Sequence, residues 1–122
     1  MTTTGEQLID KYIRFRDNPQ DWEDEMNENG LTEEEKLVIH NQLDKTFGIN
    51  DTQEKLMEIV MDKNISNFSL KMANKMRKSV AKKNKKLQEQ QFDIFYKSGE
   101  EAGTRKEMLD YVWNFLIVPQ FG

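Results

Sequence analysis

The stretch that decides the fold runs from Ser69 to Leu87 and reads SLKMANKMRKSVAKKNKKL. At about 100° per residue, one side of a helical wheel is apolar. It carries Ala73, Met76, Val80 and Leu87. The opposite side carries Lys71, Lys75, Lys78, Lys82, Lys85 and Lys86. Arg77 and Lys83 flank the apolar side from its two edges. We therefore predict one amphipathic helix with a cationic face, capped by Ser69 and only weakened at Asn84.

Outward from this stretch, the chain is predicted to be helical throughout. Pro and Gly are few, with 2 and 6 residues, and no segment alternates as a strand does. The expected fold is an all-α domain of about five to six helices, covering 1–122, with an acidic half (1–62) and a basic half (63–122). Three helices are expected in the acidic half at about 5–15, 20–28 and 32–47, where Asn29 with Gly30 ends the second and Gly48 ends the third. A fourth is expected after Asp51, and the last is expected to run from Thr104 to a stop at Pro119.

Helix starts and apolar stripes supply the finer expectations. Thr32 with Glu35, Asp51 with Glu54, and Thr104 with Glu107 have the spacing of capping boxes. Gly99 and Gly103 are expected to mark a turn. The expected apolar contacts are Leu8, Ile9, Tyr12 and Ile13; Leu37, Val38, Ile39, Leu43 and Phe47; Leu56, Met57, Ile59 and Val60; and Met108, Leu109, Val112, Trp113 and Leu116.

Composition excludes several classes of protein. The 122 residues include no Cys, so a disulfide scaffold and a thiolate site are excluded. No apolar run approaches the ~20 residues of a membrane span, and the N-terminus does not resemble a secretory signal. A cytoplasmic protein without a membrane partner is the expectation.

No catalytic set of side chains is visible. His40 is the only histidine, and a lone helical His is more often a satisfied side chain than a metal ligand. The 17–28 segment has the length of a calcium loop, but Trp22 stands where the turn needs Gly and Pro19 replaces a ligand. We therefore expect no enzyme complete in itself.

The charge is divided unevenly along the chain. The net charge is −4, but residues 63–122 carry 12 basic and 6 acidic side chains, a balance of +6. Like charges on one helix face repel one another, which favours a polyanion opposite them, such as a DNA backbone or a nucleoside triphosphate. The alternative interpretation is a solvated helix face.

The order of residues in this region resembles a known family. The segments TFGINDTQEKLM (46–57) and NFSLKMANKMRKSVAKK (67–83) are similar to part of the fingers domain of the alpha subunit of bacterial DNA polymerase III, the family C replicative polymerase. LIDKYIRFRDNP (8–19) and the 92–103 region resemble flanking parts more loosely. The matching positions are Gly48, Gln53, Glu54, Met57, Phe68, Leu70, Ala73, Arg77, Lys78, Lys82 and Lys83.

The resemblance implies a function for these cations. In the complete enzyme, the fingers cover the nascent base pair and help to bind the incoming nucleotide. The resemblance implies contacts to dNTP phosphates and primer–template DNA from Arg77, Lys78, Lys82 and Lys83, to which the basic face adds Lys75 and Lys86. Gln53 and Glu54 are expected to orient or support this site, and capping with Asp51 is the alternative for Glu54.

Two departures from the family bear on activity. Asn74 stands where the family has Asp, and neither the palm domain nor any Asp-x-Asp occurs in the chain. Two-metal phosphoryl transfer needs such carboxylates, so Mg²⁺ is expected only in the complete polymerase and we expect no polymerisation by this chain alone. The expected partners are the remaining polymerase segments, the palm and the rest of the fingers. A split-gene product, a relict and a truncated frame all fit.

Two alternatives belong to other classes. One is a small stand-alone helical protein that binds DNA or a protein through the basic face, with a phage gene as one option for its origin. The other is an interaction module whose acidic half docks onto a basic partner.

Overall fold

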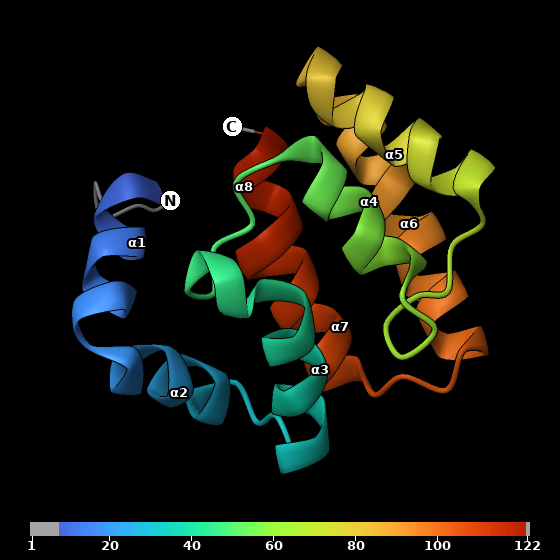
Figure 1. Cartoon of the computed structure of the whole chain (residues 1–122). Coiled ribbons are helices and arrows are strands. Elements are labelled where there is room, and N and C mark those ends of the chain that lie inside the picture. The colour runs from blue at the N-terminus through green and yellow to red at the C-terminus, as the bar shows by residue number, and fades with distance from the viewer. Residues whose placement is uncertain (1–7, 122) are drawn as a thin grey trace. The chain divides into compact units, whose positions relative to one another are not determined.

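The computed structural model describes residues 8–121, and this part of the chain is helical without any strand (Figure 1). The all-α prediction is therefore confirmed. The chain divides into two compact units, Met1–Asp51 and Thr52–Gly122. Seven helices are present within 8–121 when the last three segments are counted as one rod, slightly more than the five to six expected.

The first unit contains three helices and a short 3-10 turn. They are α1 (Leu8–Asp17), α2 (Pro19–Glu28), α3 (Glu33–Leu43) and η1 (Asp44–Thr46). The capping box at the start of α3 is confirmed, since the Glu35 N–H donates to Thr32 Oγ1 and the Thr32 N–H donates to the Glu35 carboxylate. Its core consists of Phe15, Trp22, Met26, Leu31, Ile39, Leu43 and Ile49.

Three residues that we expected in this core are exposed. Ile9, Ile13 and Leu37 are 62%, 40% and 61% exposed. Of the stripe predicted on α1, Tyr12 does pack, with its ring edge-on to the Phe47 ring at 5.4 Å, whereas Ile9 and Ile13 do not, and the buried residue of the helix is Phe15. The part of the first predicted helix before residue 8 lies outside the described residues.

Gly48 ends the first unit's helical segment as predicted. Its φ is +84°, and a Cβ there would lie 2.6 Å from the Trp22 ring. Both the left-handed backbone and the close approach of the indole therefore require glycine.

His40 is a satisfied side chain, as expected for a lone helical histidine. Its Nδ1 lies 2.6 Å from Asp44 Oδ1, its Nε2 contacts the Glu23 carboxylate, and its ring centroid is 4.2 Å from that of Trp22. Burial lowers the pKa of His40, but the hydrogen bonds with Asp44 and Glu23 outweigh it, so the pKa is raised above its usual value.

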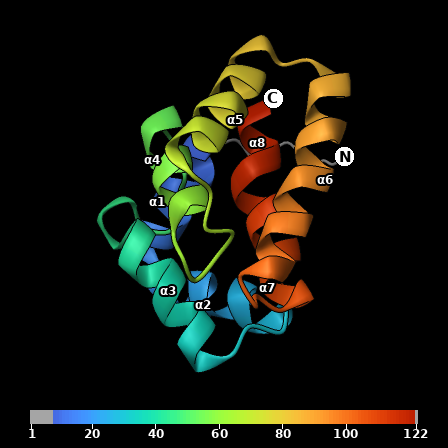
Figure 2. The same cartoon turned by 90° about the vertical axis from the view of Figure 1, so that its right-hand side faces the viewer.

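The second unit carries the segment that the sequence singled out. Its elements are α4 (Gln53–Met61), α5 (Leu70–Lys82), α6 (Lys85–Glu101), α7 (Lys106–Tyr111), a π-helical turn η2 (Val112–Ile117) and α8 (Val118–Phe121). α5 packs against α4, α6 and α8. Figure 2 shows α5 and α6 joined at one end. All five apolar residues expected in the last helix are buried: Met108, Leu109, Val112, Trp113 and Leu116.

Two predicted caps in this unit are wrong. Thr52, not Asp51, caps α4, with its Oγ1 accepting the Lys55 N–H at 3.0 Å. The Thr104 hydroxyl donates to the Ile65 carbonyl at 2.5 Å, so α7 begins after Arg105 without a side-chain cap. In the second case a distant loop competes for the hydroxyl that the local pattern assigned to the helix.

Two predicted breaks are also wrong. Gly99 lies inside α6, where it is buried and lets the helix approach Leu109, while Gly103 does form the turn with φ +84°. Pro119 lies within α8 and does not end it. The missing proline N–H is tolerated directly after the π-helical turn, where the hydrogen-bond register has already shifted.

Candidate nucleic-acid interface

The helix α5 presents its cations as the wheel predicted. Its first turn is fixed by Ser69, whose Oγ accepts the Met72 N–H at 3.2 Å, so the predicted cap is confirmed. Ala73, Met76 and Val80 are buried against the rest of the unit. The lysines of the opposite side are consequently exposed: Lys71, Lys75, Lys78 and Lys82.

The predicted single helix breaks at its C-terminal end. Lys83 has a left-handed backbone with φ 50°, and Asn84 then caps α6, with its Oδ1 accepting the N–H groups of Lys86 at 2.8 Å and Leu87 at 3.2 Å. Asn84 therefore starts a new helix where the sequence analysis expected only a weakening. Lys86 and half-buried Leu87 belong to α6, so the predicted wheel fails beyond residue 82.

The break concentrates charge at one point of the unit. We call Lys82, Lys83, Lys85 and Lys86 the cationic corner. All four side chains are exposed, at the joined ends of α5 and α6 (Figure 2). Lys85 and Lys86 lie in the first turn of α6, and this turn contains no acidic residue. The N-terminal end of a helix dipole is positive, so these lysines raise the local potential further and favour an anion there.

The cations of this surface have no acidic partners. Within residues 8–121, no ion pair joins any of the eight basic residues from Lys71 to Lys86 to a carboxylate. Elsewhere lysines are paired: Lys36, only 7% exposed, lies 3.1 Å from Glu33, and Lys11 lies 2.9 Å from Glu25. A face meant only for solvation would more often include such pairs.

Arg77 is the one half-buried cation of the set. Its guanidinium Nη2 donates to Asn74 Oδ1 at 3.5 Å, a long contact within the same helix. Because the amide is neutral, it orients Arg77 without compensating its charge.

Gln53 and Glu54 lie at the start of α4, which packs against α5. Glu54 is exposed in the first turn, where a carboxylate favours the helix dipole, and Gln53 is half-buried. In the part of the chain that the structure describes, no hydrogen bond joins either side chain to the cations of α5. The alternative that Glu54 forms a capping box with Asp51 is wrong, because Thr52 is the cap.

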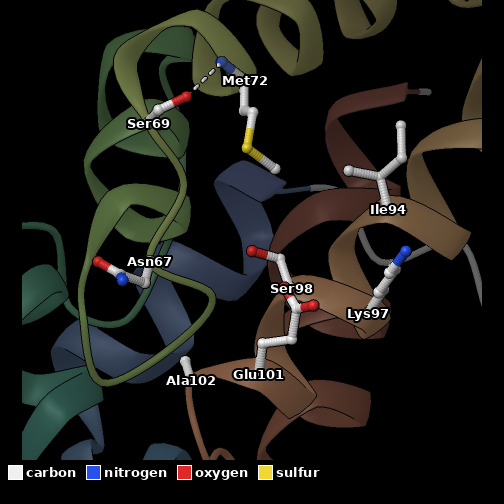
Figure 3. A pocket seen from close by; sticks show the side chains of 8 residues that line it. All are labelled: Asn67, Ser69, Met72, Ile94, Lys97, Ser98, Glu101 and Ala102. Atoms are coloured by element: carbon white, nitrogen blue, oxygen red, sulfur yellow. Dashed lines mark hydrogen bonds between the residues drawn. The ribbon is translucent and has the colours of Figure 1, made fainter.

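A cavity of about 520 Å³ lies between α5 and α6, away from the cationic corner (Figure 3). Its polar side chains include Lys97 and Glu101, and Met72 supplies an apolar side chain. The Ser98 hydroxyl at its wall donates to the Ser66 carbonyl at 2.6 Å. With one cation and one anion, the cavity does not favour a polyphosphate. The cavity was not predictable from sequence patterns, because residues 67–72 and 94–102, which line it, are distant along the chain.

Residues 8–121 contain neither a candidate metal site nor a candidate membrane span. No group of three or more His, Cys, Asp or Glu side chains in these residues is placed to hold a metal ion. No helix among them is both long and apolar enough to cross a membrane.

The unit is thus a helical domain whose one cationic face is exposed and uncompensated, a class of surface that binds polyanions. Residues 2–103 match the family model of the bacterial DNA polymerase III alpha subunit finger domain. The chain belongs to this family, and the resemblance drawn from the sequence is confirmed.

The relatives are polymerases that are much longer than this chain. It is 41% identical over all 122 residues to a probable DNA polymerase YorL of Bacillus subtilis strain 168 and equally to a DNA-directed DNA polymerase of Bacillus phage SPbeta. It is 32% identical over 71 residues, 58% of its length, to the DNA polymerase III subunit alpha of Saccharopolyspora erythraea. The chain spans 9% of the first two relatives and its match spans 6% of the third. No solved structure matches it.

Proposed function

We propose that this chain acts as part of the fingers of a replicative DNA polymerase and contacts phosphates of the incoming dNTP and of primer–template DNA. The residues assigned to these contacts are Arg77, Lys78, Lys82, Lys83, Lys75 and Lys86. Their task is charge neutralisation and positioning, without a covalent step. The observation that carries the proposal is the run of cations without acidic partners on α5 and at the start of α6.

The proposal divides the work between this chain and other polymerase segments. Phosphoryl transfer requires Mg²⁺ held by carboxylates. No group of three or more His, Cys, Asp or Glu side chains lies together among residues 8–121, which supports placing the metal elsewhere in the complete polymerase. We propose that the palm carboxylates of the complete polymerase hold it and that this chain supplies phosphate contacts beside them. Coding sequence next to that of this chain is expected to specify an Asp-x-Asp pair.

A titration of the 122-residue chain with primed DNA at 50 to 200 mM salt tests the phosphate contacts. Affinity is expected to fall steeply as salt rises. Lysines that bind phosphates displace the cations condensed on the DNA, and this release is less favourable at a higher salt concentration. Substituting Arg77→Ala together with Lys83→Ala is expected to weaken binding and to reduce the logarithmic salt slope by about 2, roughly one per lost phosphate contact.

The control must remove two charges without damaging the fold. Lys11 and Lys36 are unsuitable, because both are paired with carboxylates and Lys36 is also buried. Lys63→Ala with Lys97→Ala is the better match, because both side chains are exposed in the same unit and, within residues 8–121, neither is paired with a carboxylate. This double variant is expected to leave the salt slope nearly unchanged. An equal loss in both double variants, or no DNA binding by the unmodified chain at 50 mM salt, would overturn the proposal.

A further inference from the structure

A small cleft opens directly beside the cationic corner. It has a volume of about 310 Å³ and is lined by Lys85, Gln88, Glu89, Phe92, Asp93 and Trp113. Lys85 belongs to both the corner and the cleft wall. This volume is at the small end of the range for ligand clefts, which suits one planar ring system better than a larger ligand.

The cleft contains an exposed aromatic ring, that of Phe92, which is not part of the buried core. Phe92 remains 40% exposed, although the other rings of its cluster are more deeply placed. Trp113 meets it edge-on with ring centroids 5.2 Å apart, and Tyr96 lies tilted against it at 4.4 Å. Tyr96 is itself held by a hydrogen bond to Asp110. The Phe92 ring is therefore supported from within while part of it faces solvent.

The charges in and beside the cleft favour different positions for the base and the phosphate of a nucleotide. Glu89 and Asp93 line its wall and repel a phosphate, while the lysines of the corner attract one. A neutral base is free to enter, and carboxylates accept hydrogen bonds from the N–H groups of bases, including the imino N3–H of thymine. An exposed aromatic ring beside a cationic track is the combination with which proteins bind single-stranded nucleic acid.

We infer that this cleft binds a base of single-stranded DNA by stacking on Phe92, while the flanking phosphates lie on the cationic corner. The inference rests on the proposed function, because it uses the same corner lysines. It adds a preference: an unpaired strand is bound more tightly than its backbone charge alone explains. In duplex DNA the bases are already stacked and paired, so the cleft receives none of them.

The test compares two ligands that differ only in their bases. The 122-residue chain is titrated at low salt with a dye-labelled oligo(dT) and with an abasic strand of the same length. The unmodified chain is expected to bind oligo(dT) about tenfold more tightly, the effect of stacking roughly one base. Phe92→Ala is expected to lower oligo(dT) affinity to the level of the abasic strand, and Phe92→Trp to retain the preference.

Ile94→Ala is the matched control. Ile94 lies on the same helix and is 39% exposed, but it lines the other cavity. It is expected to change neither affinity. Equal binding of both strands by the unmodified chain, or equal losses from Phe92→Ala and Ile94→Ala, would overturn the inference. In either case, binding of the abasic strand would leave the proposed phosphate contacts standing. Binding of neither strand would overturn both, and circular dichroism of each variant separates lost binding from lost folding.

Discussion

Replacing Gly99 by Ala tests how closely α6 and α7 are packed. In an exposed helix interior this change stabilises by about 1 kcal/mol. At Gly99, however, an added Cβ would lie 2.3 Å from Leu109 Cδ2 and 2.9 Å from Cδ1. Leu109 is only 1% exposed, so its side chain has little free space to move into. Overpacking of this kind costs about 1–3 kcal/mol, and these short distances place the cost near the upper end.

The two effects leave a net destabilisation of about 2 kcal/mol. With a urea dependence of about 2 kcal/mol/M for a small domain, the midpoint of unfolding should fall by about 1 M. Circular dichroism during urea titration of the full chain measures it.

A double-mutant cycle isolates the contact. Leu109→Ala alone should cost about 2–5 kcal/mol, because it leaves a cavity. Combined with Gly99→Ala, the loss should be smaller than the sum of the two, since the new methyl group enters the space that Leu109 vacated. A rise in the urea midpoint for Gly99→Ala, as helix propensity alone demands, would refute the close packing described here.

Two further predictions concern the corner and the histidine. Lys83→Gly should stabilise the chain by about 0.5 kcal/mol, because glycine adopts the left-handed backbone without steric strain. The same change should lower the salt slope of DNA binding by about 1. A fall in the urea midpoint of unfolding would contradict the expected stabilisation. Because the pKa of His40 is raised in the folded state, its stabilising contribution is fully present below the unfolded value of about 6.5 and is lost as pH rises through the folded pKa. Urea titrations at pH 6 and 8 should show this loss of stability, and His40→Gln should abolish the difference between the two pH values. An NMR titration midpoint for His40 at or below 6.5 would contradict the raised pKa.

Much of the fold was readable from the sequence because the decisive signals are local. Ser69 and Thr32 are followed by regular helices, and their hydroxyls meet N–H groups three residues on. The failures arose where distant segments compete. The Thr104 hydroxyl turns to the Ile65 carbonyl, and the orientation of α1 follows from the position of Phe47. Neither competitor lies within the window that a helix pattern covers.

The candidate site divides in the same way. The cationic face of α5 follows from residue spacing, and burial of Met76 confirms the orientation. The absence of acidic partners for these cations depends on where the carboxylates of the folded unit lie, which spacing does not reveal. The cleft was not predictable either, because Trp113 joins Phe92 from a separate helix. Phe92 stands three residues before buried Phe95, so helical spacing does not distinguish the exposed ring from the buried one.

The proposed phosphate contacts at the start of α6 have a consequence for stability measurements. A species that binds only the folded form shifts the unfolding equilibrium by mass action. If the lysines there bind phosphate, the apparent stability of this chain is expected to be higher in phosphate than in chloride at equal ionic strength. Nucleic acid that remains bound after purification is expected to act in the same way. A stability measured for this chain would then include the free energy of anion binding.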